Sequence, residues 1–247
     1  MPATLRVGSY NVHGCLGLDR RRDVDRIARV VGGIGADAMG LQEVDSRHDA
    51  PGHETQPARL ARLTGMELVD GPILRTASGA YGNALLTRRP VHRVRRCDLS
   101  IVPYEPRGAV EALLECDGGV IRIAVTHLGL RGAERRLQVE RLLDWLGEAR
   151  EPLVLVGDLN EWRPRGYIDR RIAACLTPAL RLRTFPARFP TFALDRIAVS
   201  GDLAVGDVAV ERNADARVAS DHLPIHASVR LLSPLTPRSR APATADA

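Results

Sequence analysis

Residues 152–160, Pro-Leu-Val-Leu-Val-Gly-Asp-Leu-Asn, form the stretch that decides the fold. Its apolar residues follow a proline and stop at Gly157, which predicts a strand buried on both faces. Asp158 and Asn160 stand two positions apart, so on a strand their side chains would point to the same side. In an interior strand they are costly unless they face a polar cleft, a metal or a substrate. The alternative is a strand that ends in an Asx turn, where Asp and Asn are common.

The composition is that of an ordinary soluble globular protein. The chain has 247 residues, of which 45% are hydrophobic, enough for a full-sized core. All 35 residues counted as Lys and Arg are arginine, and a GC-rich coding genome explains this bias more simply than function does. The formal charge of +5 is compatible with phosphorylated partners. The aromatic share of 4% argues against a protein that stacks single-stranded bases along a platform.

The four cysteines, Cys15, Cys97, Cys116 and Cys175, have neither CxxC nor metal-finger spacing. We expect reduced interior thiols, although four cysteines also permit disulfides. The chain begins with the strand-like Leu5-Arg6-Val7-Gly8-Ser9-Tyr10, without a basic and apolar leader, and no long apolar span follows. We therefore expect a cytoplasmic protein without a membrane span.

Apolar patterning predicts many short strands and few helices. Strands are expected at residues 5–12, 38–44, 67–69, 81–87, 91–99, 109–115, 120–126, 152–156, 191–199, 207–211 and 225–231, and helices at 20–31, 54–64 and 133–149, with a weakly helical region at 164–183. Asp117-Gly118-Gly119 predicts a hairpin and hence antiparallel pairing. We find no repeats and no linker, and expect one domain over 1–232 with a disordered tail at 233–247. The pattern favours two sheets packed face to face with helices outside.

Polar side chains stand at the ends of these apolar strands. Each has a structural explanation by itself, such as a turn cap, a solvated charge, a satisfied core histidine or a surface ion pair. Together they are hard to explain as separate accidents: Asn11, Glu43, His127, Asp158, Asn160, Asp195, Asp221 and His222. If these strand ends converge, one cleft holds four carboxylates, two imidazoles and two carboxamides.

This set of side chains points to metal-assisted hydrolysis. Glu43 and Asp221 are hard oxygen ligands of the type that Mg²⁺ or Mn²⁺ prefers, and no thiolate or three-histidine pattern favours zinc. Asp158 suits the activation of a water, and Asp195 can orient a histidine such as His222 and hold it positive. No activated serine or cysteine stands out, since Ser220 more plausibly caps a turn. Attack by water with metal assistance is the economical mechanism.

The ordered motifs resemble the endonuclease/exonuclease/phosphatase superfamily of metal-dependent phosphoesterases over nearly the whole chain. The motifs are Ser9-Tyr10-Asn11-Val12-His13-Gly14, Leu41-Gln42-Glu43-Val44, Gly82-Asn83-Ala84-Leu85-Leu86, Pro106-Arg107-Gly108-Ala109, Thr126-His127-Leu128, Gly157-Asp158-Leu159-Asn160, Leu194-Asp195-Arg196-Ile197 and Ser220-Asp221-His222-Leu223-Pro224. The resemblance implies a four-layer α/β sandwich of the DNase I type, in which two packed mixed β-sheets are flanked by helices and the active site lies at one edge of both sheets.

The resemblance also implies a role for each site residue. Glu43 is similar to the family's principal metal ligand, with Asn11 close by and Asp221 contributing to a Mg²⁺ or Mn²⁺ site. Asp158 is similar to the proposed base, with Asn160 beside it. His127 would donate to a non-bridging phosphate oxygen, and His222, paired with Asp195, would stabilise charge on phosphorus. Arg107 stands where the family often has a substrate-facing basic residue, and we expect Asn83 to line the same cleft and to contact substrate.

The substrate is the point on which alternatives stay open. The leading hypothesis is a phosphodiesterase acting on nucleic acid, and the second is a phosphoesterase acting on a phospholipid headgroup or a small phosphorylated metabolite. The third is a non-catalytic binding protein that keeps the fold. Arginine-rich loops, including Arg88-Arg89 and residues 163–171, could track a nucleic-acid backbone or face anionic lipid, or could be solvated surface. We expect a monomer, and we see no aromatic-rich pocket segment of the kind expected in an abasic-site endonuclease.

Overall fold

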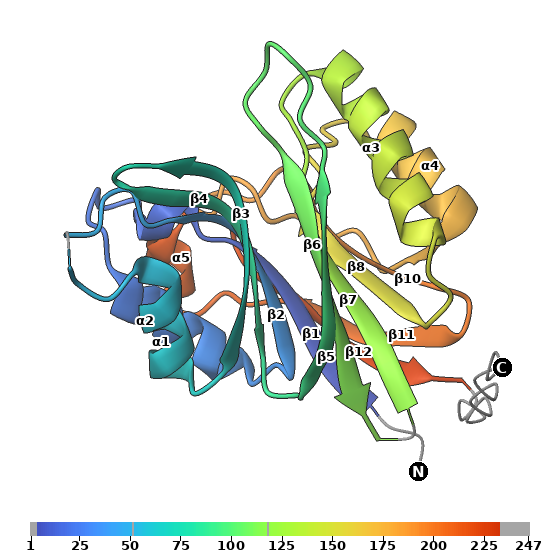
Figure 1. Ribbon diagram of the computed structural model, residues 1–247, viewed down its shortest axis with the longest axis horizontal. Coiled ribbons are helices and arrows are strands. Elements are labelled where there is room, and N and C mark those ends of the chain that lie inside the picture. The colour runs from blue at the N-terminus through green and yellow to red at the C-terminus, as the bar shows by residue number, and fades with distance from the viewer. Residues whose placement is uncertain (1–3, 51, 118, 233–247) are drawn as a thin grey trace, which may run out of the picture.

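The computed structural model describes residues 4–50, 52–117 and 119–232, so the predicted disordered tail at 233–247 lies outside the described residues. Two six-stranded mixed sheets pack face to face, with helices on both outer faces (Figure 1). The predicted four-layer sandwich is therefore confirmed.

The first sheet has the strand order β11-β12-β1-β2-β4-β3. Its strands are β1 (Thr4–Asn11), β2 (Ala38–Asp45), β3 (Glu67–Thr76), β4 (Gly79–Thr87), β11 (Leu203–Val210) and β12 (Ile225–Leu231). Helices α1 (Val24–Ile34) and α2 (Gln56–Thr64) lie on its outer face (Figure 1). The short η1 (His13–Cys15) follows β1, and the short α5 (Ala216–Ala219) precedes β12.

The second sheet has the order β5-β6-β7-β8-β10-β9. Its strands are β5 (Val91–Asp98), β6 (Gly108–Cys116), β7 (Gly119–His127), β8 (Leu153–Asp158), β9 (Thr177–Pro178) and β10 (Asp195–Val199). Helices α3 (Gly132–Gly147) and α4 (Tyr167–Cys175) cover its outer face (Figure 1). The predicted hairpin is present, since β6 and β7 pair antiparallel with Cys116 opposite Gly119.

Both sheets repeat one pattern of strand directions. Each holds a central parallel pair joined through a helix, β1 with β2 and β7 with β8, while every other neighbouring pair is antiparallel. The carboxyl ends of a parallel pair meet at one edge of the sheet, and antiparallel neighbours begin at that same edge. This shared pattern therefore brings polar strand ends from both sheets to a single edge of the sandwich.

Three apolar clusters hold the layers together. The central cluster lies between the sheets and includes Val7, Leu85, Val125, Val156 and Ile197, all at most 1% exposed. The other two pack helices α1 and α2 on the first sheet and helices α3 and α4 on the second. Burial of apolar surface at about 25 cal/mol per Å² makes these layers the main source of stability.

The two sheets approach each other closely at Gly40 of β2. A Cβ at this position would lie 2.5 Å from Cγ2 of Val156 and 3.0 Å from Cγ2 of Val125, both in the opposite sheet. Interior side chains are already close-packed, so any larger residue here must push the sheets apart.

Several element boundaries differ from the sequence prediction. Helix α1 begins at Val24, not at residue 20, because the Asp23 carboxylate accepts a hydrogen bond from the Arg26 backbone N–H (2.8 Å) and caps the helix there. The strand predicted at 191–199 begins only at Asp195, and within 164–183 only Tyr167–Cys175 is α-helical. The strand predicted at 67–69 extends to Thr76 because it pairs along β4.

The cysteines are all free, but they are not all interior. Cys15 and Cys116 are buried, whereas Cys175 at the end of α4 is exposed, so the prediction of interior thiols is wrong for Cys175. Within the described ranges, no helix has both the length and the apolar character needed to cross a membrane.

Candidate active site

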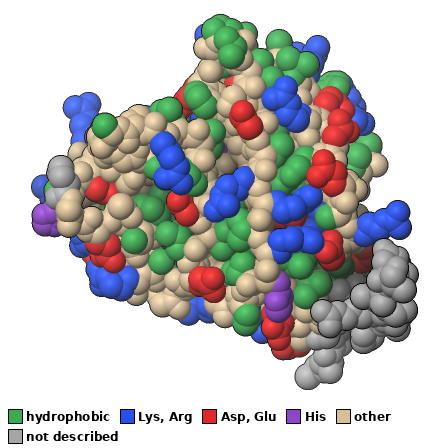
Figure 2. All heavy atoms as spheres, in the orientation of Figure 1, with side chains coloured by type: hydrophobic (Ala, Val, Ile, Leu, Met, Phe, Trp, Pro, Cys, Tyr) green, Lys and Arg blue, Asp and Glu red, His purple; other side chains and the backbone are tan. Residues whose placement is uncertain are grey.

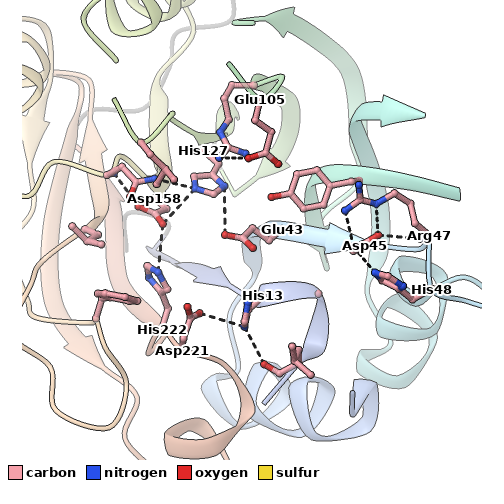
Figure 3. Close-up of a pocket in the computed structure, with 18 of the residues that line it drawn as sticks. His13, Glu43, Asp45, Arg47, His48, Glu105, His127, Asp158, Asp221 and His222 are labelled. Carbon is pink, nitrogen blue, oxygen red and sulfur yellow. Dashed lines mark hydrogen bonds and ion pairs between the residues drawn. The ribbon is translucent and has the colours of Figure 1, made fainter. Parts of the chain in front are cut away.

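The polar strand ends converge as the shared topology requires (Figure 3). β1 and β2 bring Asn11 and Glu43 from the first sheet, and β7 and β8 bring His127 and Asp158 from the second. The remaining predicted residues come from strands or loops that begin at the same edge: Asn160, Asp195, Asp221 and His222. Hydrogen bonds and ion pairs link these groups across the two sheets.

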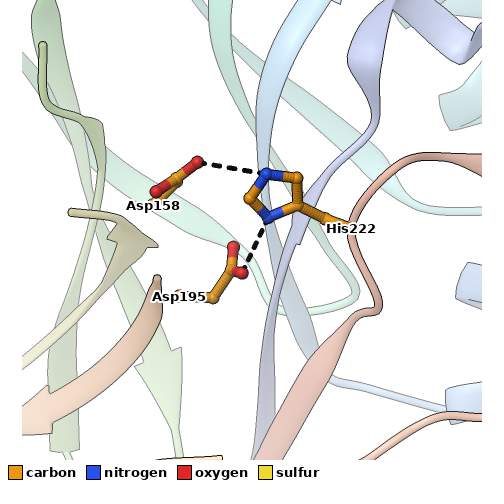
Figure 4. Close-up of side chains that lie close together, drawn as sticks. All are labelled: Asp158, Asp195 and His222. Carbon is orange, nitrogen blue, oxygen red and sulfur yellow. Dashed lines mark hydrogen bonds and ion pairs between the residues drawn. The ribbon is translucent and has the colours of Figure 1, made fainter. Parts of the chain in front are cut away.

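His222 lies between two buried carboxylates (Figure 4). Its Nδ1 is 2.9 Å from Asp195 Oδ2, and its Nε2 is 3.6 Å from Asp158 Oδ2. Burial lowers the pKa of His222, but the charges of Asp195 and Asp158 and the hydrogen bond to Asp195 outweigh it and raise the pKa to about 10. The imidazole is therefore a cation at neutral pH, held by one carboxylate on each nitrogen.

His127 has the opposite protonation state. Burial, together with the nearby charges of Arg107 and His222, lowers its pKa to about 3 in spite of Asp158. Asn160 donates its two amide hydrogens to Leu128 O (2.9 Å) and His127 Nε2 (3.1 Å). Because Nε2 accepts, the neutral ring carries its proton on Nδ1, the nitrogen on the side of Glu43.

The end of β8 has the Asx turn that was the alternative interpretation of residues 152–160. The strand stops at Asp158, and Asn160 follows in a left-handed conformation with φ of 49°. The Asn160 backbone N–H donates to Asp158 Oδ1 (2.9 Å), which is the geometry of an Asx turn. The prediction that Asp158 and Asn160 lie on one strand and point to the same side of it is therefore wrong, but the turn still directs both side chains into the same site.

Glu43 reaches the site through a β-bulge. The register of β2 against β4 shifts between Leu41 and Val44, and Glu43 has a φ of 56°. Bulges beside active sites commonly re-aim a side chain in this way. Asn11 Nδ2 donates to Glu43 Oε1 (2.8 Å) and to Asp158 Oδ2 (3.2 Å), so it bridges the carboxylates of the two sheets.

Asp221 enters on the loop before β12, which Ser220 anchors. The buried Ser220 hydroxyl donates to the Asn11 carbonyl (2.7 Å) and accepts from the His222 backbone N–H (3.3 Å). Its role in holding this turn fits the prediction that Ser220 is structural. The Asp221 carboxylate is 33% exposed and lies 3.8 Å from His13 Nδ1.

Two groups of side chains could hold a metal ion. Ligand atoms of Asp158, Asp195 and His222 lie within 4.8 Å of one another. In this group, both nitrogens of the protonated His222 ring face carboxylates, so His222 has no lone pair with which to bind a metal. Glu43 instead has an unbalanced charge: burial, Asp221 and Asp158 raise its pKa against the Asn11 hydrogen bond and His13. A divalent cation beside Glu43 and Asp221 would relieve this repulsion.

Comparison with known proteins agrees with this geometry. Residues 8–222 match the model of the Endonuclease/Exonuclease/phosphatase family. The chain belongs to this family. The uncharacterized protein YbhP of Escherichia coli K12 is 30% identical over 246 residues, covering 92% of this chain and 97% of YbhP. Members of the family are phosphoesterase hydrolases.

Solved structures show the same fold. An endonuclease/exonuclease/phosphatase from Beutenbergia cavernae is 27% identical with a TM-score of 0.74, covering 93% of this chain and 72% of that one. A mannosyl-6-phosphatase from Bacteroides thetaiotaomicron is 19% identical with a TM-score of 0.73, covering 91% of this chain and 99% of that one.

A pocket of about 480 Å³ opens onto the converged residues. One wall is aromatic, which sequence reasoning missed: Trp162 contacts Phe185 and Phe192 with ring centroids 5.7 and 5.0 Å apart, and Phe185 lies 4.8 Å from the His222 ring. These residues are separated in the chain, so no aromatic-rich segment announces them. The position of Trp162, two residues after Asn160, was the available signal.

Arginines also line the pocket, and only one of the two residues predicted to face the substrate is among the residues that line it. Arg107 lines the pocket, is 3% exposed, and pairs through Nη2 with Glu105 (2.9 Å), while its Nε and Nη1 have no hydrogen-bond partner among the residues that the structure describes. Asn83 is not among the described residues that line this pocket. Its amide donates to the Gly108 carbonyl (2.9 Å), so it fixes the backbone beside Arg107.

Proposed function

We propose that the protein is a metal-dependent phosphoesterase that hydrolyses a phosphodiester by attack of water. The observation that carries the proposal is the pair of histidines, one positive and one neutral, that converge on Asp158, with His222 also paired to Asp195. A fixed cation and a neutral donor on the same face of a pocket suit the charge that builds on a phosphoryl group in the transition state.

The residues present fit a divalent cation. Glu43 and Asp221 would hold it, with Asn11 as the third predicted contributor, because both carboxylates reach the pocket and because burial and the acidic neighbours raise the pKa of Glu43. Such an ion, Mg²⁺ or Mn²⁺, supplies polarisation of the phosphoryl oxygens and acidification of a water.

The protein's own groups account for the remaining steps. Asp158 Oδ2 faces Asn11 and both histidines, and as base it accepts the proton of the attacking water. His127, with its proton on Nδ1, donates to a non-bridging oxygen. His222, kept positive by Asp195, stabilises the negative charge at phosphorus. Asn160 orients His127, since its amide donates to Nε2 of that ring.

The walls of the pocket suggest the kind of ester. Arg107 offers an anionic oxygen two donor nitrogens that have no hydrogen-bond partner among the described residues, and Trp162 and Phe185, packed edge to face, offer apolar ring surface beside His222. A phosphodiester that carries a base or another flat group matches both walls. We therefore keep a nucleic-acid ester as the first candidate substrate.

A small phosphorylated metabolite is the second candidate, and the charge of the pocket favours it. Arg47 is already paired with Asp45 (2.9 Å) and Arg107 with Glu105, so few cations remain for a run of phosphates. On the face in Figure 2, arginine and acidic side chains are interspersed, without a continuous basic stripe. A long polyanion needs several such contacts, whereas one phosphate does not.

Hydrolysis of bis(p-nitrophenyl) phosphate and p-nitrophenyl phosphate tests the proposal, with Mg²⁺ or Mn²⁺ and with chelator. We expect metal-dependent cleavage of the diester over the monoester, and loss of cleavage in Asp158→Ala and His222→Ala. Preference for the monoester would favour the metabolite, and activity that survives both substitutions would refute the mechanism. With natural substrates, a steep loss of affinity with salt would indicate nucleic acid.

A further inference from the structure

A second pocket lies on the outer side of the second sheet, away from the catalytic groups. Its volume of about 490 Å³ falls within the range of about 300–1,000 Å³ that small-molecule sites occupy. It is bounded by α4, by β9 and β10, and by the segment that follows β8. The side chains of Leu159, Ile172 and Ala198 form its buried apolar floor, each at most 2% exposed.

The charged residues around this floor are almost all of one sign. Four arginines line the pocket, at positions 165, 170, 181 and 196, against a single acid, Asp169. That ratio differs sharply from the whole chain, where 35 basic residues face 30 acids. The excess of arginine at this pocket is therefore local.

Asp169 is already fully engaged. Its Oδ1 accepts from Arg196 Nε (3.1 Å) and Nη2 (3.0 Å), and its Oδ2 accepts from Arg181 Nη1 (2.8 Å). One carboxylate thus serves two guanidinium groups, of which Arg196 is 5% exposed. Arg165 and Arg170 add two exposed cations without an acidic partner among the described residues that line the pocket. The pocket is consequently left with a positive charge that an anion would balance.

We propose that this pocket binds a single-headed anionic amphiphile, an alkyl chain that ends in a carboxylate or phosphate. The apolar floor takes the chain, because burying it removes apolar surface from water. The arginines take the head group, because guanidinium pairs with oxyanions through two parallel hydrogen bonds. A neutral chain would leave the arginines without an anion, and a bare anion would make no contact with the apolar lining.

Calorimetric titration of the full-length protein with sodium dodecanoate below its micelle concentration tests the proposal, with dodecyl phosphate as a second head group. Dodecanol and acetate are the half-ligand controls. We expect saturable binding of one dodecanoate or dodecyl phosphate per chain, and no measurable binding of either control. Decanoate should bind more tightly than octanoate by up to about fourfold for each added CH₂.

The matched variants are Arg165→Glu/Arg170→Glu and Arg59→Glu/Arg62→Glu. Both change the net charge equally on exposed helix or loop positions, but only the first pair lines the pocket. We expect at least tenfold weaker dodecanoate binding in the first and no change in the second. Absence of saturable binding, equal binding of dodecanol, or equal loss in both variants would overturn the proposal. None of these readouts depends on catalysis, so the proposed hydrolysis stands or falls separately.

Discussion

Replacing Asp195 by asparagine should strongly reduce turnover, and it should also lower stability because it breaks a buried ion pair. The Asp195 carboxylate is fully buried and its Oδ2 lies 2.9 Å from His222 Nδ1, so the change removes one of the two negative charges that keep this imidazole positive. Breaking a buried ion pair costs about 3–5 kcal/mol. If the whole of that interaction stabilises the transition state, kcat falls by a factor between about 10² and 4 × 10³, since each 1.4 kcal/mol is tenfold.

Threonine 184 provides the matched control. Its hydroxyl donates to the same Asp195 Oδ2 (2.5 Å) but carries no charge, so Thr184→Val removes a neutral partner and leaves the carboxylate. We expect a loss of about 1 kcal/mol, less than tenfold in kcat. Both variants are assayed on bis(p-nitrophenyl) phosphate, with circular dichroism for folding and NMR titration for His222, whose pKa should fall in Asp195→Asn. A folded Asp195→Asn protein that keeps a third or more of wild-type kcat would refute this reasoning.

Three further predictions follow from the same contacts. Arg107→Met should raise KM by about 10–100-fold with little change in kcat, because Nε and Nη1 have no hydrogen-bond partner among the described residues and can bind an anionic oxygen of the substrate. Arg47→Met removes an arginine that is already paired with Asp45, so it should change KM less than fivefold. Equal effects of the two substitutions in steady-state kinetics would contradict this. Glu43→Gln should leave Tm unchanged or higher without metal, since Asp221 and Asp158 repel the carboxylate, but should abolish the rise in Tm that we expect Mg²⁺ to produce in the wild type; a preserved rise would exclude Glu43 as a ligand. Glu111→Leu should lower the free energy of unfolding by about 3–5 kcal/mol in urea titrations, because Glu111 is 1% exposed and pairs with the buried Arg122 (3.0 Å); a loss below 1 kcal/mol would show that Arg122 finds other partners.

Much of the fold could be predicted from local patterns. The apolar runs that became β1, β2, β7 and β8 are short and end in polar residues, and the hairpin signal between β6 and β7 is purely local. The first and last residues of the helices and strands were harder to predict. The capping of α1 by Asp23 and the pairing that extends β3 to Thr76 depend on contacts that a one-dimensional pattern does not contain.

The convergence of the polar strand ends could be predicted from the sequence, but the geometry of the site could not. The strand-end residues were identified because polar groups at the ends of buried strands need a reason. Their protonation states could not be predicted, because they depend on distances such as those from His222 to Asp195 and Asp158. The aromatic wall also stayed hidden, since Trp162 and Phe185 meet only when two loops fold against each other. The repeated strand directions of the two sheets leave no repeat in the sequence.

The close approach at Gly40 has a consequence for any attempt to redesign this protein. The 3.2 Å contact from Asn11 to Asp158 and the 4.0 Å contact from Glu43 to His127 both cross from one sheet to the other. Neither sheet alone carries the complete site. The thickness of the apolar layer between the sheets fixes the distance between the site residues of the first sheet and those of the second. Transplanting this chemistry to a new scaffold would therefore require copying the interface between the sheets, with its Gly40 opposite Val125 and Val156, and not only the loops at the edge.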